Sequence, residues 1–156
     1  MTTLTHTVST ALTPRQLLSV AHLFTDEALH FAYDESSAER QWTALTTADQ
    51  VQVWAIAWPP GSSTGWHDHG TASGAFVTVR GRLREHAWHG YETISELNAG
   101  RGKHFTDKHI HDVRNESDEW AVSVHAYFPV LQEMNRYALV GGELVLTGVD
   151  TEGESW

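Results

Sequence analysis

The stretch that decides the fold is Gly61-Ser-Ser-Thr-Gly-Trp-His-Asp-His-Gly70, in which two histidines stand one residue apart. In an extended strand, residues two apart face the same side, so His67 and His69 would present both imidazoles toward one point. The chain has eleven histidines and no cysteine, so its metal ligands must come from histidine and carboxylate side chains. The pair is therefore a candidate metal site, and the surrounding residues decide how much weight it carries.

Composition limits the classes of function. The 156 residues carry a formal net charge of −10, which repels phosphate backbones, so we expect no nucleic-acid partner. No apolar run approaches the roughly 18 residues that a membrane helix needs, and the N-terminal residues lack the pattern of a secretory signal. Without cysteines for disulfides, these features favour a cytoplasmic protein that makes no membrane contact and is a monomer or a small homo-oligomer.

A helical segment precedes the rest of the chain. Thr13 is a candidate N-cap, Pro14 suits the first helical position, and apolar residues recur at helical spacing through residues 13–32. A polar stretch at 34–40 ends this pattern. We therefore predict that residues 1–38 form an N-terminal helical segment packed on a barrel of residues 39–156.

From residue 41 onward the pattern is that of β-strands. Short runs rich in valine, alanine and aromatic residues occupy 51–58, 74–80, 82–88 and 120–127. Gly81 indicates a tight turn, and Gly141-Gly142 indicates a hairpin over residues 137–146. Short strands separated by turns are typical of an all-β antiparallel barrel or jelly roll.

Two glycines flank the histidine pair at fixed distances. Gly61 lies six residues before His67, and Gly81 lies twelve residues after His69. This spacing, followed by a glycine-turned pair of strands, resembles the first sequence motif of the cupins. The resemblance implies a small single-domain cupin.

A second motif supplies a third candidate ligand. The segment from His111 to Asn115 resembles the H-x3-N end of the second cupin motif. In the commoner cupin site a Glu follows the second histidine by four or five residues, where this chain has Ser73 and Gly74, so the resemblance implies a three-histidine site. Three imidazoles with open positions suit Fe(II), Cu or Zn. His109, which shares a strand face with His111, is the rival third ligand.

The pattern Ser123-x-His125-x-Tyr127 narrows the family. Alternation on one strand places the three side chains on one face, where they can hydrogen-bond in series. Together with the histidines and Asn115, this pattern resembles the cysteine dioxygenase family of non-heme iron thiol dioxygenases, over roughly residues 40–145. The resemblance implies Fe(II) held by the three histidines. It also implies that Tyr127, oriented by His125 and Ser123, hydrogen-bonds the oxygen or the thiolate.

The substrate-binding residues depart from the family's pattern. Cysteine-specific members hold the substrate carboxylate with the Arg of a Tyr-x-Arg segment, which corresponds here to Arg40-Gln-Trp-Thr-Ala-Leu45. Trp42 and Ala44 replace that pair in one alignment, and Gln41 takes the Arg position in another. Relatives with Gln there use 3-mercaptopropionate, so cysteine and a mercaptocarboxylate are both candidates. We expect four residues near the substrate, namely Arg40, Gln41, Trp42 and Trp66.

The resemblance implies an Fe(II)-dependent thiol dioxygenase that adds O₂ to the sulfur of cysteine or a related mercaptocarboxylate and yields a sulfinate. Two alternatives stay open: a biosynthetic cupin oxygenase that converts cysteine into a different product, and a non-catalytic metal-binding cupin.

Two further positions differ or stay open. In mammalian members of the family a Cys cross-links to the Tyr that corresponds to Tyr127, the last residue of the Ser-His-Tyr relay (Ser123, His125, Tyr127), whereas the position that matches this Cys is here Gly74. The segment 134–137 either closes one side of the pocket or begins a strand.

Overall fold

The computed structural model describes residues 11–151, and the remaining parts of the predicted helical segment (1–10) and barrel (152–156) lie outside them. The helices begin at a capping box in which the Thr13 hydroxyl accepts from the Gln16 N–H and the Gln16 side chain accepts from the Thr13 N–H. Helix α1 (Pro14–Leu23) thus starts where predicted, but the single helix expected to residue 32 is wrong. The chain bends at Phe24, and α2 (Thr25–Leu29) follows.

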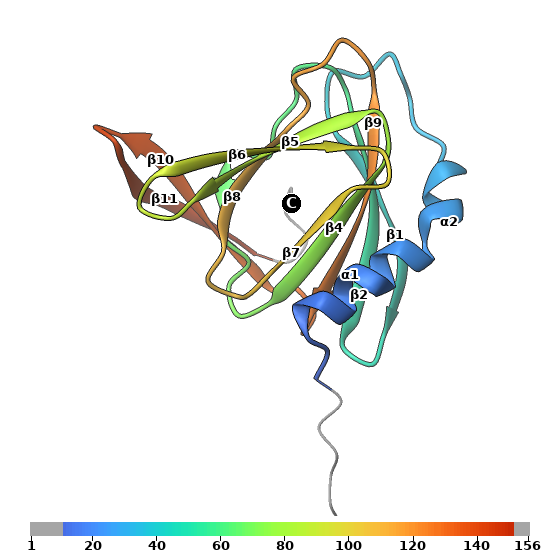
Figure 1. The fold of residues 1–156 in the computed structure, drawn as a ribbon, viewed down its shortest axis with the longest axis horizontal. Coiled ribbons are helices and arrows are strands. Elements are labelled where there is room, and N and C mark those ends of the chain that lie inside the picture. The colour runs from blue at the N-terminus through green and yellow to red at the C-terminus, as the bar shows by residue number, and fades with distance from the viewer. Residues whose placement is uncertain (1–10, 152–156) are drawn as a thin grey trace, which may run out of the picture.

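The bend lets both helices follow the outer face of one sheet. Helices α1 and α2 each contact β4 (Ser73–Arg80) and β9 (Ala121–Phe128), and Figure 1 shows them lying along that face. Leu17 of α1 and Ala28 of α2 are both buried in the cluster that covers this face of the sheet. No helix in the described residues is long and apolar enough to cross a membrane.

The strands form two antiparallel sheets, which confirms the predicted all-β barrel (Figure 1). One sheet has the order β1-β2-β9-β4-β7, and the other has the order β11-β10-β3-β8-β5-β6. The bounds of the remaining strands are β1 Gln41–Ala48, β2 Val51–Trp58, β3 Trp66–His67, β5 Arg82–Trp88, β6 Glu92–Asn98, β7 Gly102–Phe105, β8 Ile110–Arg114, β10 Glu133–Val140 and β11 Glu143–Thr151.

Side chains of β2 point alternately to the two faces of its sheet, and each face belongs to a different cluster of the core. Val53 and Ala55 belong to the cluster that includes Leu17 of α1, whereas Trp54 and Trp58 belong to the cluster between the two sheets. Because both faces of this strand are covered, its apolar run is nearly continuous. The helices therefore close one outer face, and the interior between the sheets is left for the site.

Glycines with positive φ make the two predicted turns. Gly141 and Gly142 have φ of 58° and 84°, and they join β10 to β11 by the Val140–Glu143 pair, which confirms the hairpin. Gly81, at φ 72°, joins β4 to β5, and a Cβ there would lie 2.7 Å from the Trp120 carbonyl oxygen. A side chain larger than hydrogen is therefore excluded at this turn.

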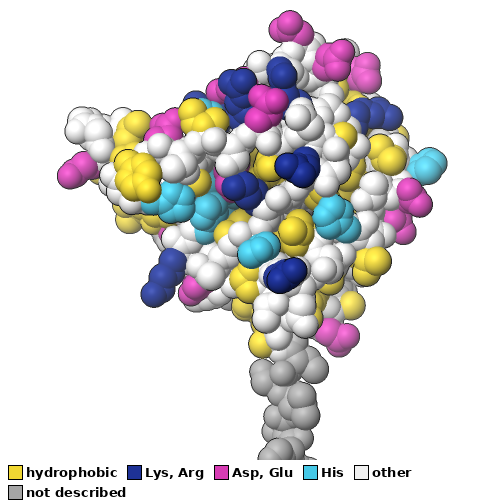
Figure 2. Space-filling model, viewed as in Figure 1, with side chains coloured by type: hydrophobic (Ala, Val, Ile, Leu, Met, Phe, Trp, Pro, Cys, Tyr) yellow, Lys and Arg dark blue, Asp and Glu magenta, His cyan; other side chains and the backbone are white. Residues whose placement is uncertain are grey.

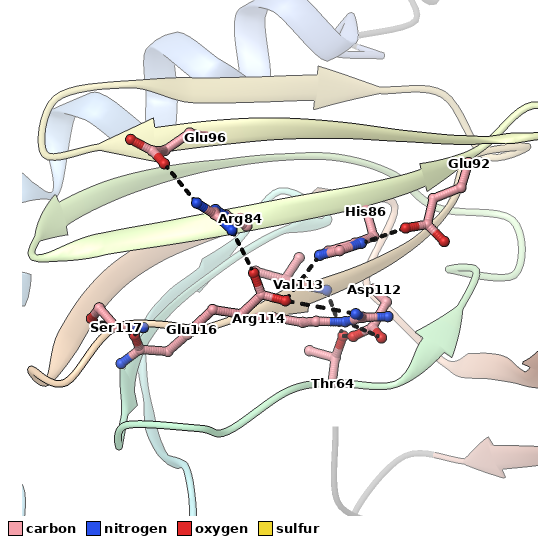
Figure 3. A network of polar contacts seen from close by, with 11 residues as sticks. Thr64, Arg84, His86, Glu92, Glu96, Asp112, Val113, Arg114, Glu116 and Ser117 are labelled. Atoms are coloured by element: carbon pink, nitrogen blue, oxygen red, sulfur yellow. Dashed lines mark hydrogen bonds and ion pairs between the residues drawn. The ribbon is translucent and has the colours of Figure 1, made fainter.

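The outer face of the second sheet carries a network of charged side chains (Figure 3). Arg84 lies 3.0 Å from Glu116, and Nδ1 of His86 lies 2.8 Å from Glu92. The Arg84–Glu116 pair is exposed and contributes little to stability, whereas His86 is buried. In this network Arg84 and His86 lie on the outer face of the sheet. Because side chains alternate along a strand, Glu85, the residue between them, faces the interior.

Candidate metal centre

Three histidines meet between the two sheets. His67 on β3 pairs with His111 on β8, and His69 follows β3 directly. Their ring centroids are 4.7 and 4.9 Å apart, and one ring nitrogen of each lies within 4.8 Å of the others. Histidines are visible on the surface in Figure 2, but these three are only 4%, 1% and 2% exposed. The structure thus brings together the three residues that the sequence predicts as ligands.

The ring nitrogens of these histidines suit a metal ion. Nδ1 of His67 lies 2.9 Å from the Gly65 carbonyl oxygen, and Nδ1 of His111 lies 2.8 Å from Oε2 of Glu85. Both oxygens are acceptors, so each Nδ1 carries the proton and each Nε2 keeps a lone pair for a metal. Neither nitrogen of buried His69 has a hydrogen-bond partner in the described chain. Because buried nitrogens without partners are costly, this arrangement fits a metal bound by three imidazoles.

Electrostatics keep the three rings neutral. Burial lowers the pKa of His67 and His69 well below the usual value, and the neighbouring histidines lower it further. Burial also lowers the pKa of His111, although Glu85 opposes the shift. Neutral imidazole is the form that binds metals. His69 is oriented by packing, since its ring stacks on Phe105 at 4.5 Å.

A hydrogen-bonded chain runs along β9. Nε1 of Trp58 donates to Oγ of Ser123 at 2.8 Å, and this oxygen lies 2.8 Å from Nε2 of His125. Since the indole can only donate, the Ser123 proton is available for Nε2, and Nδ1 of His125 then carries the ring proton. Nδ1 lies 3.3 Å from the hydroxyl of Tyr127. The phenol proton is left to point into the interior.

Burial sets the protonation of this chain of residues. Burial, with the charges of His111 and Arg40, lowers the pKa of His125 to about 3, so the ring is neutral near pH 7. Burial raises the pKa of Tyr127 well above its usual value. Tyr127 therefore remains a phenol and a hydrogen-bond donor.

A cavity opens beside these groups and holds about 350 Å³ of space, its open mouth included. Much of this space is open to solvent and the enclosed part is small, so the cavity suits a small molecule. Its polar wall contains two of the three histidines, His125, Tyr127 and two arginines. The apolar part of the wall consists of Trp54, Ile56, Val113, Leu131 and Met134.

The two arginines come from opposite ends of the chain. Arg40 lies with its guanidinium 5.3 Å from the centre of the Trp58 ring and forms no ion pair within the described residues. Burial and the charge of Arg136 lower the pKa of Arg40 to about 10, so it remains a cation. Arg136 on β10 donates to Asp150 at 2.6 Å and to the Thr64 carbonyl at 2.8 Å. A half-buried cation with no carboxylate partner suits an anionic ligand group.

Three residues expected near the substrate do not line this cavity. Gln41 hydrogen-bonds the backbone of Asp34, because it follows Arg40 on an extended segment and points the other way. Trp42 is 42% exposed and lines an open surface hollow that it shares with Arg40. Trp66 precedes His67 on its strand and packs against Trp88.

The sequence analysis missed the role of Glu85 and left that of Arg136 open. Segment 134–137 does both things considered for it, since it lies in a strand and places Met134 and Arg136 in the cavity wall. The sequence does contain a signal for Glu85: alternation along β5 places this charged residue on the inward face of the strand. The rival ligand His109 lies 3.1 Å from Glu85 and is not grouped with His67 and His69.

Gly74 lies against the ring of Tyr127. A Cβ at this position would be 2.9 Å from Cδ1 of Tyr127 and 2.6 Å from the ring of Phe105. The position that the resemblance matches to the cross-linking Cys is therefore next to the relay Tyr. The chain has no cysteine with which to form the link.

Two sheets closed around buried histidines define a cupin with a candidate metal centre, and solved structures share the fold. Oxalate oxidase is 18% identical, with a TM-score of 0.55 over 64% of this chain, which spans only 56% of that chain. A double-stranded β-helix protein from Klebsiella pneumoniae is 16% identical, with a TM-score of 0.56 over 80% of this chain and 94% of that one. A cupin superfamily protein from Desulfitobacterium hafniense is 12% identical, with a TM-score of 0.54 over 66% and 86%.

The sequence places the chain within one family of this class. Residues 20–139 match the family model for cysteine dioxygenase type I. The chain therefore belongs to the cysteine dioxygenase type I family, which confirms the resemblance based on the two histidine motifs and the relay.

Proposed function

We propose that this protein is an Fe(II)-dependent thiol dioxygenase of the cytoplasm, acting on a small thiol that carries a carboxylate. Both atoms of O₂ end on the sulfur, so that one thiol and one O₂ give one sulfinic acid. The observation that carries the proposal is that a single cavity wall contains two of the candidate ligands, Tyr127 and the cation of Arg40. Membership of the cysteine dioxygenase type I family supports the same chemistry.

The three histidines fit iron and favour an anionic sulfur beside it. Iron bound by these residues would gather the thiolate and O₂ at one centre and lower the pKa of the thiol. His67, His69 and His111 are all neutral, so the ligands themselves supply no negative charge. An anionic thiolate substrate is therefore the group that the site lacks.

The arginines hold the substrate carboxylate. Arg40 has no ion pair in the described chain, and Arg136 lines the same cavity. A guanidinium offers paired donors that match a carboxylate. The presence of Arg40, and not Gln41, in the wall makes L-cysteine and 3-mercaptopropionate candidates of equal standing, since both carry this group.

Tyr127 orients the reacting groups. Its hydroxyl keeps its proton because burial raises its pKa, and His125 fixes its position from behind. The phenol donates a hydrogen bond into the cavity, toward the sulfur or the oxygen. Trp54, Leu131 and Met134 give the cavity an apolar wall beside this hydroxyl.

The test is oxygen uptake by anaerobically Fe(II)-loaded protein with L-cysteine, 3-mercaptopropionate and cysteamine in parallel, with product masses recorded. We expect uptake with a carboxylate-bearing thiol and a product heavier by two oxygen atoms. Cysteamine, which lacks the carboxylate, should react far more slowly. Uptake with another product mass would favour the biosynthetic oxygenase. No uptake with iron still bound would favour a non-catalytic metal-binding cupin.

A further inference from the structure

A buried carboxylate lies directly behind one of the candidate ligands. Glu85 on β5 is 2% exposed, and its Oε2 lies 2.8 Å from Nδ1 of His111 and 3.1 Å from Nε2 of His109. Strand β5 pairs with β8 so that Ala87 faces His111, which places Glu85 two residues along the same inner face. A carboxylate is rarely buried without a specific partner, so its position calls for a function.

Glu85 contacts two imidazoles but has no permanently charged cation beside it. Its ion-pair partners in the described residues are these two histidines, and none is a lysine or arginine. A buried negative charge of this kind is favourable only where a positive charge lies close by. A divalent metal on the far nitrogen of His111 would supply that charge.

We propose that Glu85 is the positioning residue of the metal centre, which fixes the tautomer of His111 and supplies the negative charge absent from the ligands. In the commoner cupin site, a Glu that follows the second histidine supplies this charge as a ligand. Here Glu85 would supply it from behind the third histidine, His111, without binding the metal. With Nδ1–H held by Glu85, the Nε2 lone pair of His111 faces His67 and His69. The inference rests on the proposed metal site and states what sets the affinity of that site.

The chain contains a matched control for this interaction. His86 and Glu92 form a second histidine–carboxylate pair, with Nδ1 also 2.8 Å from the carboxylate oxygen, on the neighbouring strands β5 and β6. His86 is not among the candidate ligands and belongs to the outer network in Figure 3. Glu92→Gln therefore removes the same charge from the same kind of pair without touching the metal site.

The experiment compares the wild type, Glu85→Gln and Glu92→Gln as full-length, metal-free proteins. We would measure Co(II) affinity anaerobically by competition with a chromophoric chelator, the visible spectrum of the Co(II) form, and thermal unfolding with and without Co(II). We expect Glu85→Gln to weaken binding roughly 10- to 100-fold and to shift the Co(II) bands. Its melting temperature without metal should change little, because the amide oxygen of Gln can still accept a hydrogen bond from Nδ1 of His111. Glu92→Gln should bind like the wild type.

Each result has a separate meaning. If the wild type binds no metal, the proposed function fails as well. If the wild type binds metal and Glu85→Gln binds it equally well, only the positioning role is overturned. A lower melting temperature of Glu85→Gln both with and without metal, at unchanged affinity, would indicate a structural role. Two metal ions per chain would also overturn the proposal, since Glu85, His109 and His111 would then be ligands themselves.

A second variant covers the case in which Glu85→Gln does not fold. Glu85→Asp keeps the charge but withdraws the carboxylate from His111 by one methylene. We expect it to fold and to bind Co(II) more weakly than the wild type. Unchanged affinity in a folded Glu85→Asp protein would overturn the positioning role.

Discussion

The guanidinium of Arg40 lies 5.3 Å from the centre of the Trp58 ring, and the edge of the same indole donates a hydrogen bond to Ser123. One buried side chain therefore supports both the cation proposed to hold the substrate and the chain of residues that ends at Tyr127. A cation over an indole face is attracted by the quadrupole of the neutral ring, whose face is electrostatically negative, and this contact helps Arg40 to stay half-buried without a carboxylate.

Replacing Arg40 should impair carboxylate-bearing thiols selectively. A hydrogen bond to a charged group contributes about 1.5–3 kcal/mol, so Arg40→Met should lower kcat/KM for the true substrate roughly 10- to 100-fold. The activity with cysteamine should change little. The matched control is Gln41→Ala, since Gln41 points away from the cavity. Equal losses with both thiols would argue against carboxylate binding by Arg40.

Tyr127→Phe should keep the metal and slow turnover. The substitution removes only the hydroxyl that receives the His125 hydrogen bond, while the ring still packs near His69 at 5.4 Å. We expect unchanged metal content and a fall in kcat of roughly 10²-fold or more, which is typical of losing a positioned donor. Metal analysis and steady-state rates test this together. A variant with wild-type kcat would remove Tyr127 from the mechanism.

His111→Ala should lose the metal, whereas His109→Ala should retain it. Only His111 lies with the ring nitrogens of His67 and His69 in one group. Metal content after loading and desalting distinguishes the two variants. Normal metal content in His111→Ala would overturn the assignment of this ligand, and loss in His109→Ala would favour the rival.

The metal-free protein should lose stability in acid through His125. The pKa of His125 is lowered from 6.5 to about 3 in the folded state, so between these values the unfolded chain binds more protons. The contribution of neutral His125 to the free energy of unfolding should therefore be complete above pH 6.5. It should fall as the pH decreases below this value, by up to about 1.4 kcal/mol per pH unit.

Urea unfolding at pH 7.5, 6 and 5, with a chelator present, measures this slope. His125→Asn should show a shallower dependence on pH than the wild type, although it is less stable at pH 7.5. Parallel curves for the two proteins would show that another group carries the acid sensitivity.

The residue spacing was sufficient to predict much of the site. Alternation on a strand predicts that His67 and His69, and Ser123, His125 and Tyr127, share faces, because the side-chain period in a strand is two. The capping residues of α1 and the Gly141-Gly142 turn follow from local chemistry in the same way. The bend at Phe24 has no such local signal in the sequence.

The residues that contact the substrate could not be chosen from the sequence. Arg40 and Gln41 are neighbours, so one must face inward and the other outward. The pairing of β1 with β2, in which Gln41 lies opposite Ala57, decides between them. A shift of one residue would exchange their places. Glu85 was missed for a related reason, because its partner His111 lies on another strand and only the register of β5 with β8 joins them.

Gly74, Phe105 and Tyr127 occupy one small volume, and this has an evolutionary consequence. A side chain at position 74 would collide with the Phe105 ring, the same ring that stacks on His69. We therefore predict that relatives with a cysteine at this position have a smaller or displaced side chain at the place of Phe105, and with it a different support for the second histidine. Positions 74 and 105 should covary across the family, so that a lineage gains or loses the cross-link and this aromatic support together.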